Sequence, residues 1–86
     1  MSNITIEIEP GVAVDLYAAA SIQVGTQIEV ENLCEFSGKL YSTQSSPSST
    51  DDFSRLWPED SLVNESGDLG AWIASDNKML LRVRVV

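Results

Sequence analysis

The end of the chain carries the feature that most restricts the fold, a strict alternation of side chains over residues 79–86. A repeat of two residues is the signature of a β-strand, because successive side chains point to opposite faces of a sheet. Arg82 and Arg84 share one face, whereas the other face is wholly apolar: Met79, Leu81, Val83 and Val85. An apolar strand left open at an edge invites aggregation. We therefore expect this segment to pair inside a sheet, either in its own subunit or against a neighbour.

Shorter segments show the same alternation or a β-forming composition, and turn residues separate them. They cover residues 4–8, 12–16, 27–33, 39–43, 61–64 and 71–75. Strands and turns that recur about every 8 to 12 residues are typical of sandwiches and barrels. The sequence therefore predicts an all-β fold: a small antiparallel β-sandwich or barrel of about 6–8 short strands with one short helical turn. We expect residues 1–86 to form a single β domain.

The turns between these segments predict two local pairings. Pro10 and Gly11 separate the first two strands, which we expect to form a hairpin or a bent pair. A second hairpin is expected across residues 34–38. Residues 44–52 contain no apolar side chain apart from Pro47, and this composition predicts the longest loop, a mobile connection or a binding loop.

Two segments predict helical turns instead of strands. Residues 17–21 contain three consecutive alanines, which favour a single helical turn or a loop. Phe53, Leu56 and Trp57 follow the i, i+3, i+4 spacing of one helical turn, with aspartates before them as capping residues and Pro58 after them. We expect a short helix or 3₁₀ turn here, plugging one end of the sheet.

Charge and composition exclude several classes of partner. The 86 residues include 13 Asp and Glu against 5 Lys and Arg, for a formal charge of -8. That charge repels phosphate backbones and anionic bilayers, so we expect no direct nucleic-acid binding and no membrane partner. No apolar run approaches the roughly 20 residues needed to cross a bilayer, and the start of the sequence does not resemble a signal peptide. The sequence predicts a protein made in the cytoplasm.

Catalytic chemistry lacks its usual residues in this chain. Nucleophilic mechanisms need a base beside the nucleophile, and the sequence has no histidine. Cys34 is the only cysteine, so it forms no internal disulfide, and the neighbouring Glu35 would raise the pKa of a thiol. We expect Cys34 to be buried or inert. The sequence therefore predicts a protein that is not an enzyme, with no catalytic residue and no cofactor.

Carboxylates could act in acid and base catalysis or bind calcium, and both alternatives stay open. The candidate acid pairs are adjacent or alternate in sequence, which is more typical of helix caps, turns and the solvated face of a strand: Asp51 with Asp52, Glu59 with Asp60, and Glu29 with Glu31. Asp68, with Glu65 and Asp76, could supply oxygen ligands to calcium, but the twelve-residue EF-hand order is missing. We expect no metal site.

Aromatic and arginine side chains are the candidates for partner binding. The aromatic residues could form a platform for a sugar ring, but core packing or interface anchoring is the favoured interpretation: Tyr17, Tyr41, Trp57 and Trp72. The two arginines of the last strand could pair with glutamates of their own chain or contact an acidic neighbouring subunit. The predicted partner-binding residues are Trp57, Trp72, Arg82 and Arg84.

The overall design of the sequence resembles small virion proteins of tailed bacteriophages. The features that carry the resemblance are Gly-Thr-Gln-Ile-Glu-Val-Glu-Asn-Leu over 25–33, the Ser- and Pro-rich loop, Ser-Gly-Asp-Leu-Gly-Ala-Trp-Ile over 66–73 and the valine-rich last strand. The resemblance implies a structural protein of the virion, a head decoration or a neck or tail accessory. It also implies other virion proteins as partners and a homo-oligomer.

The strong negative charge supports an alternative function. An acidic protein can mimic nucleic acid and thereby block a nucleic-acid-binding protein of the host. The acids are spread along the chain instead of forming one block, which favours the virion interpretation.

Overall fold

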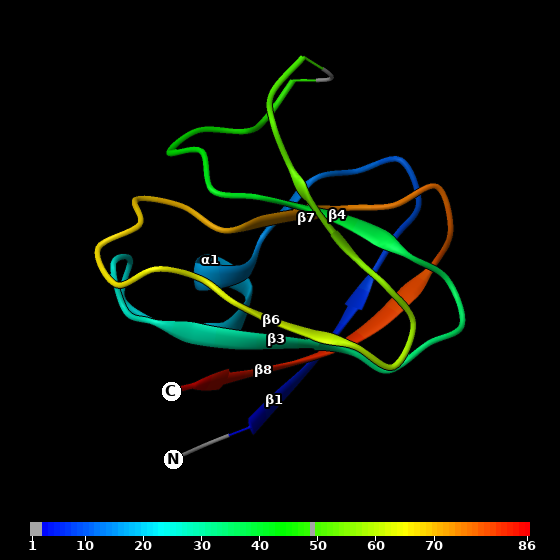
Figure 1. The fold of residues 1–86 in the computed structure, drawn as a ribbon, viewed down its shortest axis with the longest axis horizontal. Helices are drawn as coiled ribbons and strands as arrows, with labels where there is room; N and C mark the ends of the chain where they lie inside the picture. The colour runs from blue at the N-terminus through cyan, green and yellow to red at the C-terminus, as the bar shows by residue number, and fades with distance from the viewer. Residues whose placement is uncertain (1–2, 49) are drawn as a thin grey trace.

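Two four-stranded antiparallel sheets lie face to face in the computed structural model, which describes residues 3–48 and 50–86 (Figure 1). Sheet A has the strand order β1 (Asn3–Ile8), β8 (Met79–Val85), β3 (Ile28–Asn32), β6 (Ser61–Val63). Sheet B has the order β2 (Val14–Asp15), β7 (Trp72–Ala74), β4 (Gly38–Tyr41), β5 (Ser54–Leu56). One helix, α1 (Leu16–Ala20), follows β2. The predicted all-β sandwich is confirmed.

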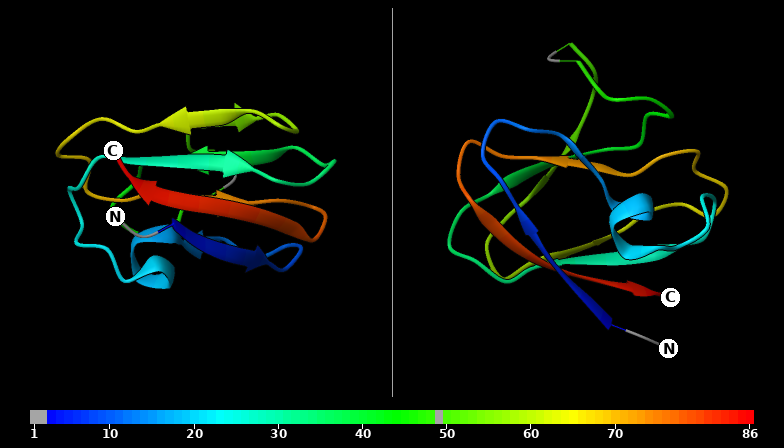
Figure 2. Two further views of the ribbon diagram at one scale, coloured as in Figure 1. Left: turned by 90° about the horizontal axis from the view of Figure 1, so that it is seen from below. Right: turned by 180° about the vertical axis from the view of Figure 1, so that it is seen from behind.

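The last strand lies in the interior of sheet A, between β1 and β3, as the left view of Figure 2 shows. Its alternation corresponds to burial, because Met79, Leu81 and Val83 are at most 1% exposed and point into the core. The strand pairs antiparallel with both neighbours, so the apolar segment finds its partners within its own chain. The strand predicted from the end of the sequence is thus confirmed.

Both sheets contribute to one apolar core. Its members come from the inward faces of the strands and from α1, and include Ile8, Leu16, Ile28, Leu56, Ile73 and Leu81, each without measurable exposure. The alternation with a period of two therefore corresponds to burial, because each strand turns one of its faces toward this apolar core. The predicted strand at 27–33 shows it most clearly, because Ile28, Val30 and Asn32 are buried on one face of β3.

Both predicted hairpins are wrong. β1 pairs with β8, and β2 pairs with β7 in the other sheet, so the turn at Pro10 and Gly11 carries the chain from sheet A to sheet B. Likewise the 33–37 connection joins β3 of sheet A to β4 of sheet B. The physical reason is that these consecutive strands lie in different sheets, where they bury their apolar faces against each other across the core, instead of pairing side by side in one sheet.

The helical turn predicted at 17–21 is confirmed as α1, which the side chain of Asp15 caps by accepting from the backbone N–H of Tyr17 at 3.0 Å. The helical turn predicted at 53–57 is wrong, because this segment forms β5. Its spacing also satisfies a period of two, with Phe53 and Trp57 exposed and Leu56 buried. Pairing with β4 decides in favour of the strand.

Two buried asparagines replace backbone pairing at the ends of β3. Asn64 accepts from the backbone N–H of Ile28 at 2.7 Å and donates to the hydroxyl of Tyr17 at 2.6 Å, and that hydroxyl donates to the carbonyl of Thr26. At the other end, Asn32 donates to the carbonyls of Phe36 and Leu56. These bonds satisfy polar groups that would otherwise be buried without partners.

The edge strand β6 has both of its ends covered by aspartates. The carboxylate of Asp60 accepts from the backbone N–H of Ser61, and the carboxylate of Asp68 accepts from that of Glu65. The strand itself is only three residues long. The predicted edge strand at 61–64 is confirmed, and the backbone N–H of its first residue already has a partner in Asp60.

Candidate functional site

The outer face of sheet B carries a groove of about 750 Å³. Alternation places Ala13 and Ala74 on this outer face, and their short side chains leave the centre of the groove open. The walls come from strands β4 and β5 and from the loops around them, and they include Phe36, Lys39, Tyr41, Arg55, Trp57 and the segment 46–48. We call this surface the sheet B groove.

Arg55 contacts three neighbouring side chains at the wall of the groove. Its guanidinium carbon lies 5.5 Å from the ring centres of both Phe53 and Trp57, the two aromatic residues that flank it on the outer side of β5. The guanidinium also donates to the hydroxyl of Ser37 at 3.2 Å. A cation–π contact of this kind contributes about 0.5–1 kcal/mol at an exposed site and restricts the rotamers of the long side chain.

Lys39 lies beside Arg55, because the two residues are directly opposite in the pairing of β4 with β5. The Lys39 ammonium is 5.0 Å from the Phe53 ring centre, and that ring packs against Tyr41 at 5.7 Å. Phe53 therefore links both cations to the aromatic side chains. Like charges directly opposite on two strands repel each other, and the shared ring partly compensates for this.

These two cations lack a carboxylate partner among the described residues. The chain has five Lys and Arg residues. Three of them form ion pairs elsewhere: Lys78 with Glu7, Arg82 with Glu31, and Arg84 with Glu29. In a protein of charge -8, the uncompensated positive charge is thus concentrated at the sheet B groove.

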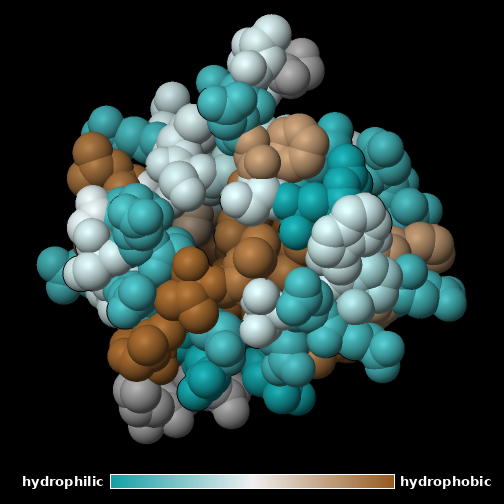
Figure 3. Space-filling model, in the orientation of Figure 1, coloured by the Kyte–Doolittle hydropathy of each residue, from teal (hydrophilic) through white to brown (hydrophobic). Residues whose placement is uncertain are grey.

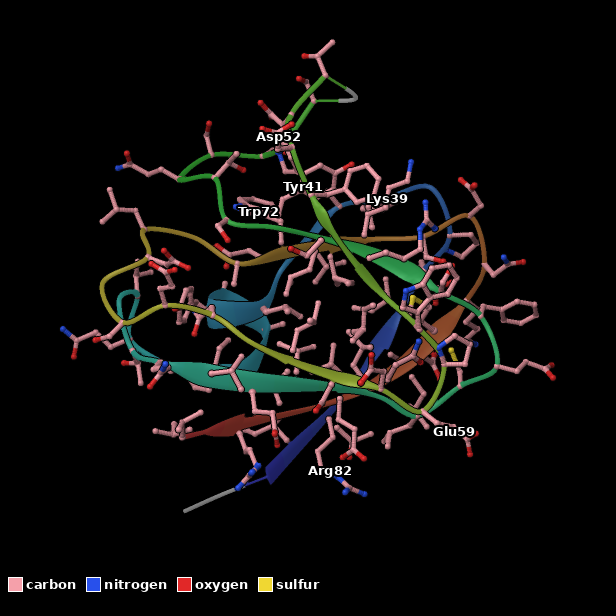
Figure 4. The ribbon with its side chains drawn as sticks, viewed as in Figure 1. Lys39, Tyr41, Asp52, Glu59, Trp72 and Arg82 are labelled. Carbon is pink, nitrogen blue, oxygen red and sulfur yellow. The ribbon has the colours of Figure 1, made fainter. Side chains whose placement is uncertain are left out.

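The two tryptophans predicted to bind a partner occupy different positions. Trp57 is 57% exposed at the rim of the groove, so its ring is available to a partner. Trp72 lies opposite Tyr41 on the same face but is half-buried, and its indole N–H is buried without an acceptor. Figure 4 shows Trp72, Tyr41 and Lys39 on the sheet B side of the molecule. Trp72 therefore supports the surface more than it presents a contact.

Arg82 lies on the opposite side of the molecule, on the outer face of sheet A (Figure 4). Arg84, two residues further along β8, shares that face. The pairing of β3 with β8 places Glu31 opposite Arg82 and Glu29 opposite Arg84. The sequence left two interpretations of these arginines, pairing with glutamates of the same chain or contact with an acidic neighbouring subunit. The structure contains the pairs with glutamates of the same chain. The two arginines do not lie together with Trp57.

The Glu29 and Arg84 pair changes the acidity of both groups. The hydrogen bond from Arg84 lowers the pKa of the Glu29 carboxyl, and the same bond raises the pKa of Arg84. Because the pKa of Glu29 is lower in the folded state, the pair stabilises the fold above the pKa of an unfolded glutamate. This contribution disappears as the pH falls through the folded pKa.

Replacing Arg84 with Met is expected to raise the pKa of Glu29 toward its ordinary value, because the bond that lowers it is removed. The carboxyl carbon shift of Glu29, followed by NMR across the acidic range, measures this. Arg55→Met, on the other sheet, is the matched control and should leave the titration of Glu29 unchanged. An unaltered Glu29 titration in Arg84→Met contradicts the assigned pairing.

The other candidate chemistry finds little support in the geometry. Cys34 is half-buried, and its thiol lies 3.1 Å from the Asn32 side chain oxygen. Asp68 binds the backbone N–H of Glu65, and the described residues contain no cluster of three or more acids or thiols that could hold a metal ion. Tyr17 is 1% exposed, which removes it from any sugar platform.

A second, smaller hollow of about 280 Å³ lies between β4 and β6. Leu40, Leu62 and Val63 contribute apolar lining, and Figure 3 shows apolar residues gathered at the centre of this view. Glu65 and Asp68 at its rim are already joined by a hydrogen bond. This hollow carries no free cation and no exposed aromatic ring, so the sheet B groove is the better candidate.

No protein-family model, curated protein or solved structure matches the chain. In the described residues, no helix has the length and apolar character needed to cross a membrane. The assignment of a site therefore rests on the geometry of this molecule.

Sequence reasoning identified Trp57 but missed its neighbours Phe53, Arg55 and Lys39 as a site. A signal was present, because Phe53, Arg55 and Trp57 follow a period of two. The helical interpretation of this segment concealed it, since a helix would have separated the arginine from both rings.

Proposed function

We propose that this chain is a non-enzymatic structural or accessory protein of a tailed-bacteriophage virion, and that it docks on other virion proteins through the sheet B groove. The observation that carries the docking surface is the combination of two uncompensated cations with exposed aromatic rings beside an open groove. Trp, Tyr and Arg are the residues most enriched at binding hot spots. The virion setting rests on the resemblance in overall sequence design.

The geometry also supports docking by a surface that needs little rearrangement. Arg55 already contacts two rings and a hydroxyl in the free chain, so binding is expected to lose less side-chain entropy than it would with an arginine that makes no contacts. Trp57 adds a large apolar area with few rotatable bonds. Several copies on one particle would add such contacts by avidity, which is why a homo-oligomer or many-copy arrangement belongs to the proposal.

The proposed function can be tested on purified phage particles. The chain is expected to be found in them by mass spectrometry, and a tagged copy should co-purify with them through a density gradient. Trp57→Ala and Arg55→Gln should reduce that co-purification about tenfold or more, the usual effect of losing a hot-spot residue. Arg82→Gln, which removes a cation from the opposite sheet, is the matched control, and this variant should co-purify with the particles as well as the unaltered chain does.

Two results would contradict the proposal. Absence of the chain from particles removes the virion setting, and full retention of both groove variants removes the sheet B groove as the docking surface. Circular dichroism of each variant shows that lost binding does not reflect lost folding.

The alternative, an acidic inhibitor that mimics nucleic acid, is supported by the charge of -8. Salt separates the two functions. An acidic mimic should lose its partner steeply as ionic strength rises, whereas docking through aromatic rings and one or two charges should weaken only slightly.

A further inference from the structure

We propose that the sheet B groove takes an extended, acidic segment of a partner protein, with a carboxylate bound by Arg55 and an adjoining apolar side chain over the alanine floor. This inference rests on the docking function proposed above and names the chemistry of the occupant. It follows from the geometry of the arginine, the position of the second cation, and the distribution of charge along the groove.

The guanidinium of Arg55 is prepared to bind a carboxylate. A guanidinium has five N–H donors in one plane, and the structure assigns one bond from them, to Ser37. Phe53 and Trp57 flank the group at equal distances and limit its movement. A planar donor set held in this way matches the two oxygens of a carboxylate, which binds arginine through two parallel hydrogen bonds.

Lys39 adds a second positive charge at the same place. It is opposite Arg55 across the β4–β5 pair and lines the same groove. An aspartate or glutamate of a partner would therefore meet both cations together. Since neither cation has a carboxylate partner among the described residues, the incoming group replaces water and not an existing ion pair.

The floor and the rim provide a place for an apolar side chain. Ala13 and Ala74 leave space that larger residues would fill, and Tyr41 and Trp57 stand at its sides. The volume of about 750 Å³ falls within the usual range for ligand sites, which is about 300–1,000 Å³. An extended segment places alternate side chains on one face, so a carboxylate and an apolar group two residues apart can point into the groove together.

The rest of the lining decides against a nucleic acid. Glu35 and Asp76 also line the groove, from the loops that follow β3 and β7. A polynucleotide would carry its regularly spaced phosphates past these carboxylates and along a molecule of charge -8. A peptide can place its acid at Arg55 and leave neutral residues beside Glu35 and Asp76. The favoured occupant is thus acidic at one position and not uniformly anionic.

Titration of the whole chain with short probes tests the inference. The first probe is a six-residue peptide of serines that carries one aspartate and, two residues later, one leucine, blocked at both ends, and the second probe replaces the aspartate with asparagine. The aspartate peptide should shift the NMR signals of the Trp57 indole and the Arg55 guanidinium. Arg55→Gln should weaken its binding about tenfold or more, and Arg55→Lys should weaken it less, because a lysine keeps the charge but loses the planar donor set.

Arg82→Gln is the matched control and should bind the aspartate peptide as tightly as the unaltered chain. Equal binding of the aspartate and asparagine peptides overturns the inference. So does tighter binding of a six-nucleotide oligothymidylate at about 0.15 M salt. The chain could also associate with itself through the groove. If Arg55→Gln abolishes that self-association and the aspartate peptide does not affect it, the groove binds a second copy of the chain, and the inference is overturned.

The two proposals fail separately. If the chain is retained on particles through Arg55 but the aspartate peptide does not bind, the acidic occupant is wrong and docking stands. If the aspartate peptide binds through Arg55 but the chain is absent from particles, the chemistry of the occupant stands and the virion function is wrong.

Discussion

Asn64→Ala is expected to lower the free energy of unfolding by about 3 kcal/mol, because it removes the centre of a buried hydrogen-bond network. The alanine leaves the backbone N–H of Ile28 without an acceptor and takes away the donor that binds the Tyr17 hydroxyl. Leaving a buried polar group unsatisfied costs about 1–3 kcal/mol, more than the net value of the bond itself. Urea denaturation measures the change through the transition midpoint.

Asn77→Ala is the matched control for this substitution. Asn77 is exposed in the turn between β7 and β8, so its replacement should change the free energy of unfolding by about 0.5 kcal/mol or less. A loss below about 1 kcal/mol in Asn64→Ala would show that the asparagine is not needed to satisfy Ile28 and Tyr17.

Gly70→Ala is expected to destabilise the fold by about 3 kcal/mol or more, because two backbones meet where the new methyl group would stand. A Cβ atom on Gly70 would lie 1.7 Å from the carbonyl oxygen of Thr43 and 2.7 Å from its carbonyl carbon. Neither atom belongs to a flexible side chain, so the backbone before β7 or after β4 must move. Thermal unfolding should show a midpoint lower by about 10 °C or more.

Gly38→Ala provides the comparison. Its Cβ would meet the sulfur of Met79 at 2.7 Å, but the methionine side chain can rotate away. We expect a loss of about 1 kcal/mol there. Equal losses at Gly70 and Gly38, within about 0.5 kcal/mol, would show that the Thr43 backbone moves as easily as a side chain.

Apart from β5, which the helical spacing of residues 53–57 concealed, the sequence was sufficient to predict the strands but not their partners. Burial on one face produces the alternation in β1, β3 and β8, and that signal is local. The pairing of β1 with β8 joins residues at opposite ends of the chain, and no local pattern records it. Both hairpin predictions were wrong for this reason, since they assumed that neighbours in sequence are neighbours in a sheet.

The candidate site shows the same limit. Trp57 could be chosen from its residue type alone, whereas Lys39 and Arg55 acquire their role only from the β4–β5 register. In the same way, Arg82 and Arg84 could be placed on one strand face, but the glutamates opposite them come from β3, about 50 residues earlier in the chain. A pattern that describes one strand cannot report what the adjacent strand contributes.

The aspartates at the two ends of β6 have a consequence for the protein at high local concentration. Open β-strand edges allow proteins to polymerise by adding strand to strand, without regard to partner. At β6, one of the edge strands, the edge is three residues long, and acidic side chains bind the backbone N–H of its first residue, Ser61, and that of Glu65, two residues beyond its last. Addition of a second strand to β6 is thereby discouraged, and recognition on this side of the molecule is left to side chains, which can distinguish one partner from another.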